Sequence, residues 1–183
     1  MTRRQTLPQL WLLSDARNDA GLFAAIARLP RGSAVVFRHY HLPRAERYAR
    51  WIEVRRMAHR FRHWAVLADA PHRARQWGAD GIYASAAGFA GHRAAGAGLL
   101  RIVTAHSMRE LAAARRAGAD AVMLSPVFPT RSHPDGNSLG VVRFRLLARW
   151  AGVPVIALGG MTAKGAHAAN WPRWAAIDGL AMQ

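Results

Sequence analysis

Eight short apolar runs alternate with helix-like stretches along this chain, and that alternation constrains its fold more than any other feature. Most runs are continuously apolar, which is typical of strands buried on both faces of a parallel sheet. Helical stretches between parallel strands form βα units, so we expect an α/β protein. The predicted strands comprise residues 10–15, 34–37, 64–67, 81–85, 100–104, 121–125, 154–158 and 177–182.

Two architectures fit this order, a closed eight-stranded barrel and an open doubly wound sheet. The turn after the first strand reads Ser14-Asp15-Ala16-Arg17 and lacks the glycine-rich dinucleotide fingerprint, which argues against a nicotinamide-binding fold. Eight regular units favour the (β/α)8 TIM barrel, although such barrels typically have about 250 residues. We therefore predict one domain over residues 1–183, a short TIM barrel with the last helix missing.

Helices are predicted from apolar periodicity and capping residues. The longest covers residues 43–61, with Tyr48, Ile52 and Phe61 facing the core and its arginines facing solvent. Another begins at Ser107, which forms a capping box with Glu110. The segment 86–98 is rich in alanine and glycine and is predicted to be only loosely helical.

The composition limits the classes of function. There are 26 basic residues against 10 acidic ones, a net charge of +16, and every basic residue except Lys164 is arginine. Such a surface attracts phosphates, anionic metabolites and nucleic acid. Cysteine is absent, which excludes disulfides, thiolate metal sites and a cysteine nucleophile. Because no apolar run reaches the roughly 18 residues of a spanning helix and no signal peptide is visible, we expect a cytoplasmic protein without a membrane partner.

In a TIM barrel the chemistry lies at the carboxyl ends of the strands. Gly159-Gly160 follows the seventh strand, where bare glycine amides at the start of a helix can hold a phosphate; a tight turn would also require glycine. Thr104 and His106 end the fifth strand. His106 is a candidate general acid or base, or an anion contact. The alternative is that Thr104 caps the next helix and His106 is a solvated loop residue.

The loop after the sixth strand, residues 125–133, is too long and too rich in hydroxyls for a simple connector. Thr130, Ser132 and His133, together with Arg131, would suit a phosphorylated ligand. The alternative is an exposed, mobile loop.

Two further charged residues end strands. Arg38 follows the second strand and has no obvious structural duty. Asp69 follows the third strand and is a candidate magnesium ligand, although a lone carboxylate makes a poor magnesium site. The alternative for Asp69 is a cap on the helix that starts at Pro71.

Six segments carry distinctive patterns: Ala79-Asp80-Gly81-Ile82, residues 104–110, Ala117-Gly118-Ala119-Asp120, residues 125–130, Leu139-Gly140 and residues 154–161. In this order, over residues 12–181, they resemble the thiamine phosphate synthase family and its relative, the TenI-type thiazole tautomerase. The resemblance implies a TIM barrel that joins a pyrimidine diphosphate to a thiazole phosphate, with Mg²⁺ and cationic side chains stabilising the diphosphate leaving group.

Carried over by position, the resemblance and the strand-end pattern assign roles to named residues. Catalysis falls on Arg38, Thr104, His106, Thr130 and His133. Phosphate binding falls on Thr130, Ser132, Gly159 and Gly160, and the magnesium ligand is Asp69.

The chain departs from the family pattern mainly on the diphosphate and magnesium side. Tyr40 and His133 stand where the family has lysine, Ala68 where it has asparagine, and Gly88 where it has aspartate. The thiazole phosphate side keeps Gly159-Gly160, but the family's second phosphate loop falls where this chain ends. The catalytic histidine of the tautomerase branch falls on Pro126.

Three hypotheses follow, in this order. The first is a divergent thiamine phosphate synthase. The second is a TenI-like or repurposed barrel that binds a thiazole phosphate or another small phosphate without a metal. The third is a non-catalytic basic barrel that binds nucleic acid, through the arginines of residues 44–62, or a protein partner; we expect small phosphorylated ligands rather than nucleic acid. A missing last helix would also leave the wall open beside the first and eighth strands, so we expect a homo-oligomer.

Overall fold

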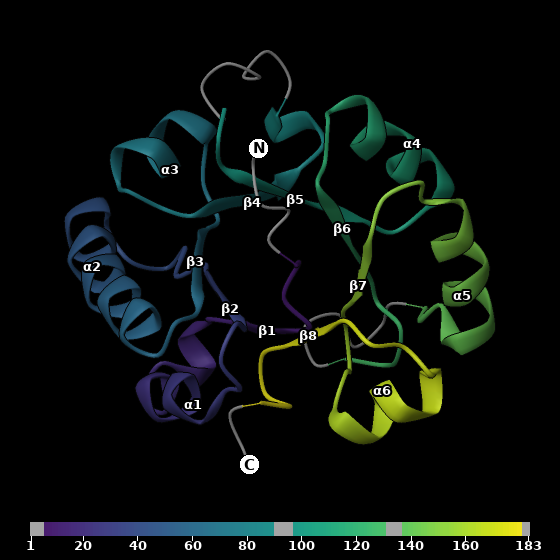
Figure 1. The fold of residues 1–183 in the computed structure, drawn as a ribbon, viewed down its shortest axis with the longest axis horizontal. Helices are drawn as coiled ribbons and strands as arrows, with labels where there is room; N and C mark the ends of the chain where they lie inside the picture. The colour runs from purple at the N-terminus through teal and green to yellow at the C-terminus, as the bar shows by residue number, and fades with distance from the viewer. Residues whose placement is uncertain (1–5, 90–96, 131–136, 181–183) are drawn as a thin grey trace.

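The computed structural model describes residues 6–89, 97–130 and 137–180. Eight parallel strands close into a barrel in sequence order, with each strand paired to the next and β8 paired to β1 (Figure 1). The prediction of a closed (β/α)8 barrel is confirmed. The strands are β1 (Leu10–Leu13), β2 (Ala34–Phe37), β3 (Trp64–Leu67), β4 (Gly81–Ser85), β5 (Leu100–Ala105), β6 (Ala121–Leu124), β7 (Val155–Ala157) and β8 (Trp174–Ala176).

Helices surround the barrel as an outer ring (Figure 1). They are α1 (Leu22–Arg28), α2 (Arg44–Arg60), α3 (Pro71–Gln76), α4 (Met108–Arg116), α5 (Gly140–Trp150) and α6 (Ala163–Ala169). Two 3-10 turns, η1 (Ala16–Asn18) and η2 (Ala87–Phe89), follow β1 and β4. Within the described residues, which extend to Leu180, no helix follows β8, so covering of the β1–β8 wall by a second copy stays a prediction.

The buried side chains form two clusters, because successive residues of a strand point to opposite faces of the sheet. Trp11, Leu13 and Val36 belong to the cluster that fills the barrel interior. Leu12 and Val35 belong to the larger cluster between the strands and the helices. Both faces of each strand are therefore apolar, which is the physical reason for the continuous apolar runs in the sequence.

Of the residues predicted to face the core from the long helix, Ile52 and Phe61 are partly buried and pack against it, whereas the prediction for Tyr48 is wrong. Tyr48 is 44% exposed, and α2 instead buries Arg47, Trp51 and Val54. The Trp51 indole donates a hydrogen bond to the Trp77 carbonyl at 2.9 Å, which sets the rotation of the helix. A hydrophobicity pattern cannot find this face because one of its members is an arginine.

The predicted eighth strand is displaced. The structure forms β8 at Trp174–Ala176, with Trp174 opposite Leu10 and Ala176 opposite Leu12. The predicted strand, residues 177–182, instead begins beyond β8, and residues 181–183 lie outside the described part. Ala175 shares the interior cluster with Trp11, whereas Trp174 and Ala176 belong to the cluster between the strands and the helices.

Among the described residues, none of the helices has the length and apolarity needed to cross a membrane.

Candidate functional site

A cavity of about 710 Å³ opens at the carboxyl ends of the strands. Six of the predicted site residues lie together in its lining, each contributed by a segment that ends or follows a strand: Arg38, Thr104, His106, Thr130, Gly159 and Gly160. The lining also includes residues that the sequence analysis did not select: Arg17, Tyr83, Asn137, Thr162 and Asp178. Two of the predicted residues, Ser132 and His133, lie outside the described residues.

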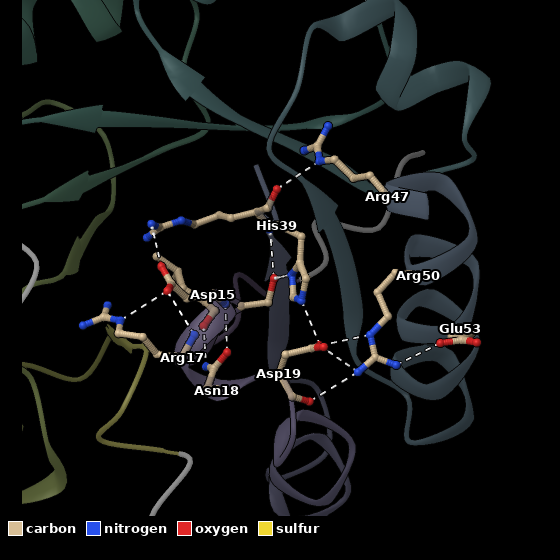
Figure 2. Close-up of polar contacts among 11 residues, drawn as sticks. Asp15, Arg17, Asn18, Asp19, His39, Arg47, Arg50 and Glu53 are labelled. Atoms are coloured by element: carbon tan, nitrogen blue, oxygen red, sulfur yellow. Dashed lines mark hydrogen bonds and ion pairs between the residues drawn. The ribbon is translucent and has the colours of Figure 1, made fainter. Parts of the chain in front are cut away.

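A carboxylate joins the two arginines of the cavity (Figure 2). Asp15 follows β1 and caps the turn η1, and its carboxylate lies 3.2 Å from Arg17 Nε and 3.1 Å from Arg38 Nη2. Partial burial raises the pKa of Asp15, but hydrogen bonds from Arg17 and the charges of both arginines outweigh it, so the pKa lies below its ordinary value. Asp15 therefore stays ionised and holds both guanidinium groups at the cavity.

His106 is paired with a carboxylate of its own helix start. Its Nδ1 lies 2.8 Å from Glu110 Oε2, and the same oxygen accepts the His106 backbone N–H at 2.9 Å. Burial raises the pKa of Glu110, but the hydrogen bonds from His106 lower it below its ordinary value. A carboxylate only accepts, so Nδ1 donates and Nε2 is the ring nitrogen that can exchange a proton with a ligand. The predicted cap is confirmed: Ser107 Oγ accepts the Glu110 N–H at 3.3 Å.

The turn Gly159-Gly160 can be made only by glycine. The two residues have φ values of 90° and 63°, in the left-handed region. A Cβ on Gly159 would meet Pro126 at 2.7 Å, and one on Gly160 would collide with the Pro129 carbonyl oxygen. Phe128 N–H donates to the Gly159 carbonyl at 3.0 Å, so the loop after β6 packs directly on this turn. Both Cβ directions point into this loop, so loop packing requires the glycines, and the two residues also line the cavity.

The loop after β8 also lines the cavity, because β8 ends earlier than predicted. Ile177, Asp178 and Gly179 all belong to the lining. Asp178 Oδ2 lies 3.6 Å from Arg17 Nη1, which places a carboxylate at the mouth. The part of the prediction that the displaced strand overturns is the assignment of residues 177–179 to a strand. The signal that could have found this displacement is Pro172, since a strand starting shortly after that proline ends near residue 176.

Tyr83, from β4, contributes a neutral phenol. Burial raises its pKa to about 12, so its hydroxyl remains protonated and can donate a hydrogen bond near neutral pH.

Comparison with known proteins shows which family this chain belongs to. The family described as thiamine monophosphate synthase matches residues 12–182, which is nearly the whole chain. The chain belongs to the thiamine monophosphate synthase family. Its curated relatives include thiamine-phosphate synthases from Geobacillus thermodenitrificans, 39% identical over 69 residues (36% of this chain, 31% of that protein), and from Methanocella arvoryzae, 38% identical over 93 residues (49% and 42%). The matched segments thus span less than half the length of these relatives.

Solved structures show the same fold at low sequence identity. Thiamine phosphate pyrophosphorylase from Pyrococcus furiosus has a TM-score of 0.77 and 21% identity, over 94% of this chain and 86% of that one. The corresponding protein from Bacteroides thetaiotaomicron has a TM-score of 0.60 and 13% identity, over 93% and 82%.

In this member of the thiamine monophosphate synthase family, Asp69 does not fit a magnesium ion. Its carboxylate is 9% exposed and is held by Arg47 Nη1 at 2.5 Å and Arg73 Nη1 at 2.9 Å, while its Oδ1 accepts the Ala70 N–H at 2.7 Å. Asp69 is not part of the cavity lining, and no cluster of three metal-ligating side chains occurs in the part of the chain described. A cation would have to displace a guanidinium from each oxygen, so we derive no step through a metal.

Three other family positions that differ, Tyr40, Ala68 and Gly88, also lie away from the cavity lining, and His133 lies outside the described residues. Tyr40 is 64% exposed and lies beside two guanidinium groups, 5.9 Å from Arg38 and 5.4 Å from Arg47, measured from each Cζ to the ring centre. Ala68 offers its carbonyl to Arg47 Nη2 at 2.8 Å. Arg47 therefore fills the space at the ends of β2 and β3, and among the described residues of these two strand ends only Arg38 reaches the cavity.

Proposed function

We propose that the cavity binds a small heterocyclic phosphate, the thiazole phosphate of this family's reaction, with its phosphate against the Gly159-Gly160 turn. The observation that carries this proposal is the turn itself, whose backbone lines the same cavity as Arg38 and Thr130. Backbone amides presented by glycines bind oxyanions without a side chain in the way. Tyr83 and His106 would contact the heterocycle and fix its orientation.

The activity that this binding would serve is joining of the thiazole to a pyrimidine diphosphate. The thiazole ring nitrogen attacks the pyrimidine methylene carbon, while the bond from that carbon to the diphosphate oxygen breaks and diphosphate leaves with the electron pair. Arg38 and Arg17 would stabilise the negative charge that develops on the leaving group. Asp15 keeps both guanidinium groups in place for this role.

A second candidate, binding without joining, is favoured by one observation. The carboxylate that aligns with the family's magnesium position is neutralised by Arg47 and Arg73. If no cation can bind there, one positive charge that would stabilise the diphosphate leaving group is missing. By analogy with lost oxyanion donors, such a loss lowers the rate by a factor on the order of 10² to 10³.

Calorimetry separates ligand binding from the absence of a site. We expect thiazole phosphate to bind and the unphosphorylated thiazole alcohol to bind at least about tenfold more weakly, the effect of one lost charge-assisted contact. Gly160→Ala should abolish the difference between the two ligands, because the added Cβ collides with the loop. Gly32→Ala is the matched control: Gly32 also has positive φ, 82°, but open space around it. Equal affinity for both ligands would reject the proposal.

A joining assay then separates the two candidates. The protein is mixed with thiazole phosphate and pyrimidine diphosphate, with and without Mg²⁺, and diphosphate release is followed. Release that requires thiazole phosphate supports the synthase. Binding of thiazole phosphate with no release at high protein concentration supports the second candidate.

A further inference from the structure

A buried hydrogen-bonded chain runs from the cavity arginine to the outer helices (Figure 2). The Arg38 N–H donates to Ser14 Oγ at 2.9 Å, and Ser14 Oγ lies 2.8 Å from His39 Nδ1. His39 Nε2 lies 2.8 Å from Asp19 Oδ1, which also accepts from Arg50 Nη2 at 2.7 Å. The His39 side chain is fully buried and stacks on Phe37 with ring centres 4.6 Å apart.

The chemistry of these groups fixes every proton in the chain. Asp19 is ionised: burial raises its pKa, but hydrogen bonds from Arg50 and His39 lower it below the ordinary value. Because a carboxylate only accepts, His39 Nε2 carries the proton that it donates to Asp19. Burial lowers the pKa of His39 and outweighs the opposing effect of Asp19, so the ring is neutral and Nδ1 accepts from the Ser14 hydroxyl. Ser14 Oγ in turn accepts the Arg38 N–H.

Serine, histidine and aspartate in this order resemble a hydrolytic triad, but Ser14 is not a nucleophile. Its side chain is fully buried, and it does not line the cavity. Its oxygen is already engaged with both Arg38 and His39. The chain therefore acts on the position of Arg38 rather than on a substrate carbonyl.

We propose that His39, acting through Ser14, is a positioning residue for Arg38, and that protonation of His39 loosens the contact that holds the Arg38 backbone beside the cavity. A protonated Nδ1 becomes a donor to Ser14 Oγ, so the hydroxyl proton has to turn away and the oxygen must accept from both Nδ1 and the Arg38 amide, which weakens its contact with that amide. His39 has a φ of 32°, which is unusual for a residue with a side chain. The hydrogen bonds of its two ring nitrogens, to Ser14 and Asp19, hold the residue in this conformation. The part of this inference that concerns anion binding in the cavity rests on the proposed function.

Charged and titratable groups surround His39 from each neighbouring element. Asp19 precedes α1, Arg50 comes from α2, and the His41 ring lies 5.2 Å away in the loop after β2. The positive charges of Arg50 and His41 oppose protonation of His39, whereas Asp19 favours it. The cavity residue His106 pairs instead with Glu110, whose Oε2 lies 2.8 Å from its Nδ1.

The first test needs no ligand. Nitrogen-15 NMR of the imidazoles should show His39 with a proton on Nε2 and none on Nδ1. As the pH falls through the His39 transition, the Arg38 backbone amide should shift with the same midpoint in the wild type. His39→Gln keeps one donor and one acceptor but cannot titrate, so in that variant the amide should not shift at this midpoint. The opposite tautomer, or an Arg38 amide that does not follow His39, would overturn the proposal.

The second test measures anion binding with sulfate, which stays a dianion throughout. His39→Leu should weaken sulfate binding about tenfold or more, the consequence of one misplaced charge-assisted contact, while His39→Gln should bind at neutral pH like the wild type. His63→Leu is the matched control, since His63 is 4% exposed and its Nε2 contacts only the Ile26 carbonyl among the described partners. Equal loss in both leucine variants, or no loss in either, contradicts the positioning role.

If His39→Leu does not fold, the amide titration in the wild type and His39→Gln decides. A wild type that binds neither sulfate nor thiazole phosphate rejects the proposed function, and the NMR result then still decides the inference.

Discussion

The buried guanidinium of Arg47 connects the carboxyl ends of β2 and β3 and thereby stabilises the fold. Replacing Arg47 with methionine tests that role. Methionine keeps the length and apolar stem of the side chain but removes the guanidinium. In the structure that group donates to the Arg38 carbonyl at 3.0 Å, to the Ala68 carbonyl at 2.8 Å and to the Asp69 carboxylate. It also lies over the Phe37 and Trp77 rings, at 5.8 Å from each.

The cost follows from what is left behind. Removing one partner of a buried ion pair typically costs about 3 to 5 kcal/mol, because the other charge stays buried. Asp69 keeps Arg73, whose side chain is 29% exposed, so we expect the lower end, about 3 kcal/mol. For a chain of this size such a loss lowers the midpoint of thermal unfolding by about 6 to 12 °C.

Thermal and urea unfolding followed by circular dichroism measure this loss. Arg50→Met is the matched control, since Arg50 lies one turn further along α2 and pairs with the partly exposed Asp19 and Glu53. Pairs of that kind contribute about 0 to 1 kcal/mol. If Arg47→Met destabilises no more than Arg50→Met, the argument that a buried guanidinium ties β2 and β3 together is refuted.

Two other predictions concern stability. Phe144 is fully buried and meets the Trp171 ring edge-on at 5.1 Å, so Phe144→Ala should lower the free energy of unfolding by about 3 to 5 kcal/mol in urea titrations, whereas Leu146→Ala, at a half-exposed position, should change it by less than about 0.5 kcal/mol. Burial raises the pKa of Asp69 but its hydrogen bonds and Arg47 lower it below the ordinary value, so its stabilising effect is complete above about pH 4 and is lost as the pH falls through the lower, folded-state pKa. The difference in unfolding free energy between wild type and Asp69→Asn should therefore shrink in acid, and a difference that grows instead would contradict the assigned sign.

The barrel could be predicted because burial on both faces leaves a clear mark on the sequence of each strand. A strand buried on both faces must be apolar throughout, and seven of the eight predicted strands agree with the structure to within two residues at either end. The residues that cap helices and form turns could also be predicted from the sequence. Ser107 caps α4, and Gly159-Gly160 occupies backbone angles that other residues avoid.

The parts that escaped prediction are those where a long-range contact outweighs a local pattern. β8 is placed by its pairing with β1, and Pro172 is the only local signal of its position, because Trp174-Ala175-Ala176 itself lacks the apolar run of the other strands. Arg47 is buried because two carbonyls, a carboxylate and aromatic rings surround it in three dimensions. His39 is missed for the same reason, since its partners Ser14 and Asp19 are distant in sequence.

The large positive charge of the chain does not concentrate in the cavity. At the mouth, three aspartates each bind two basic side chains: Asp15 with Arg17 and Arg38, Asp19 with His39 and Arg50, and Asp69 with Arg47 and Arg73. In the described lining, histidine aside, the formally charged residues are Arg17, Arg38 and Asp178, so two positive charges and one negative leave a net of +1. Asp15 also pairs with both arginines from outside the lining, so a single phosphate, which carries about −1.5 to −2, would be held chiefly by the glycine turn. A diphosphate carries more negative charge than this lining offsets, which is why binding of the thiazole phosphate stands on firmer physical ground than its joining to a pyrimidine diphosphate.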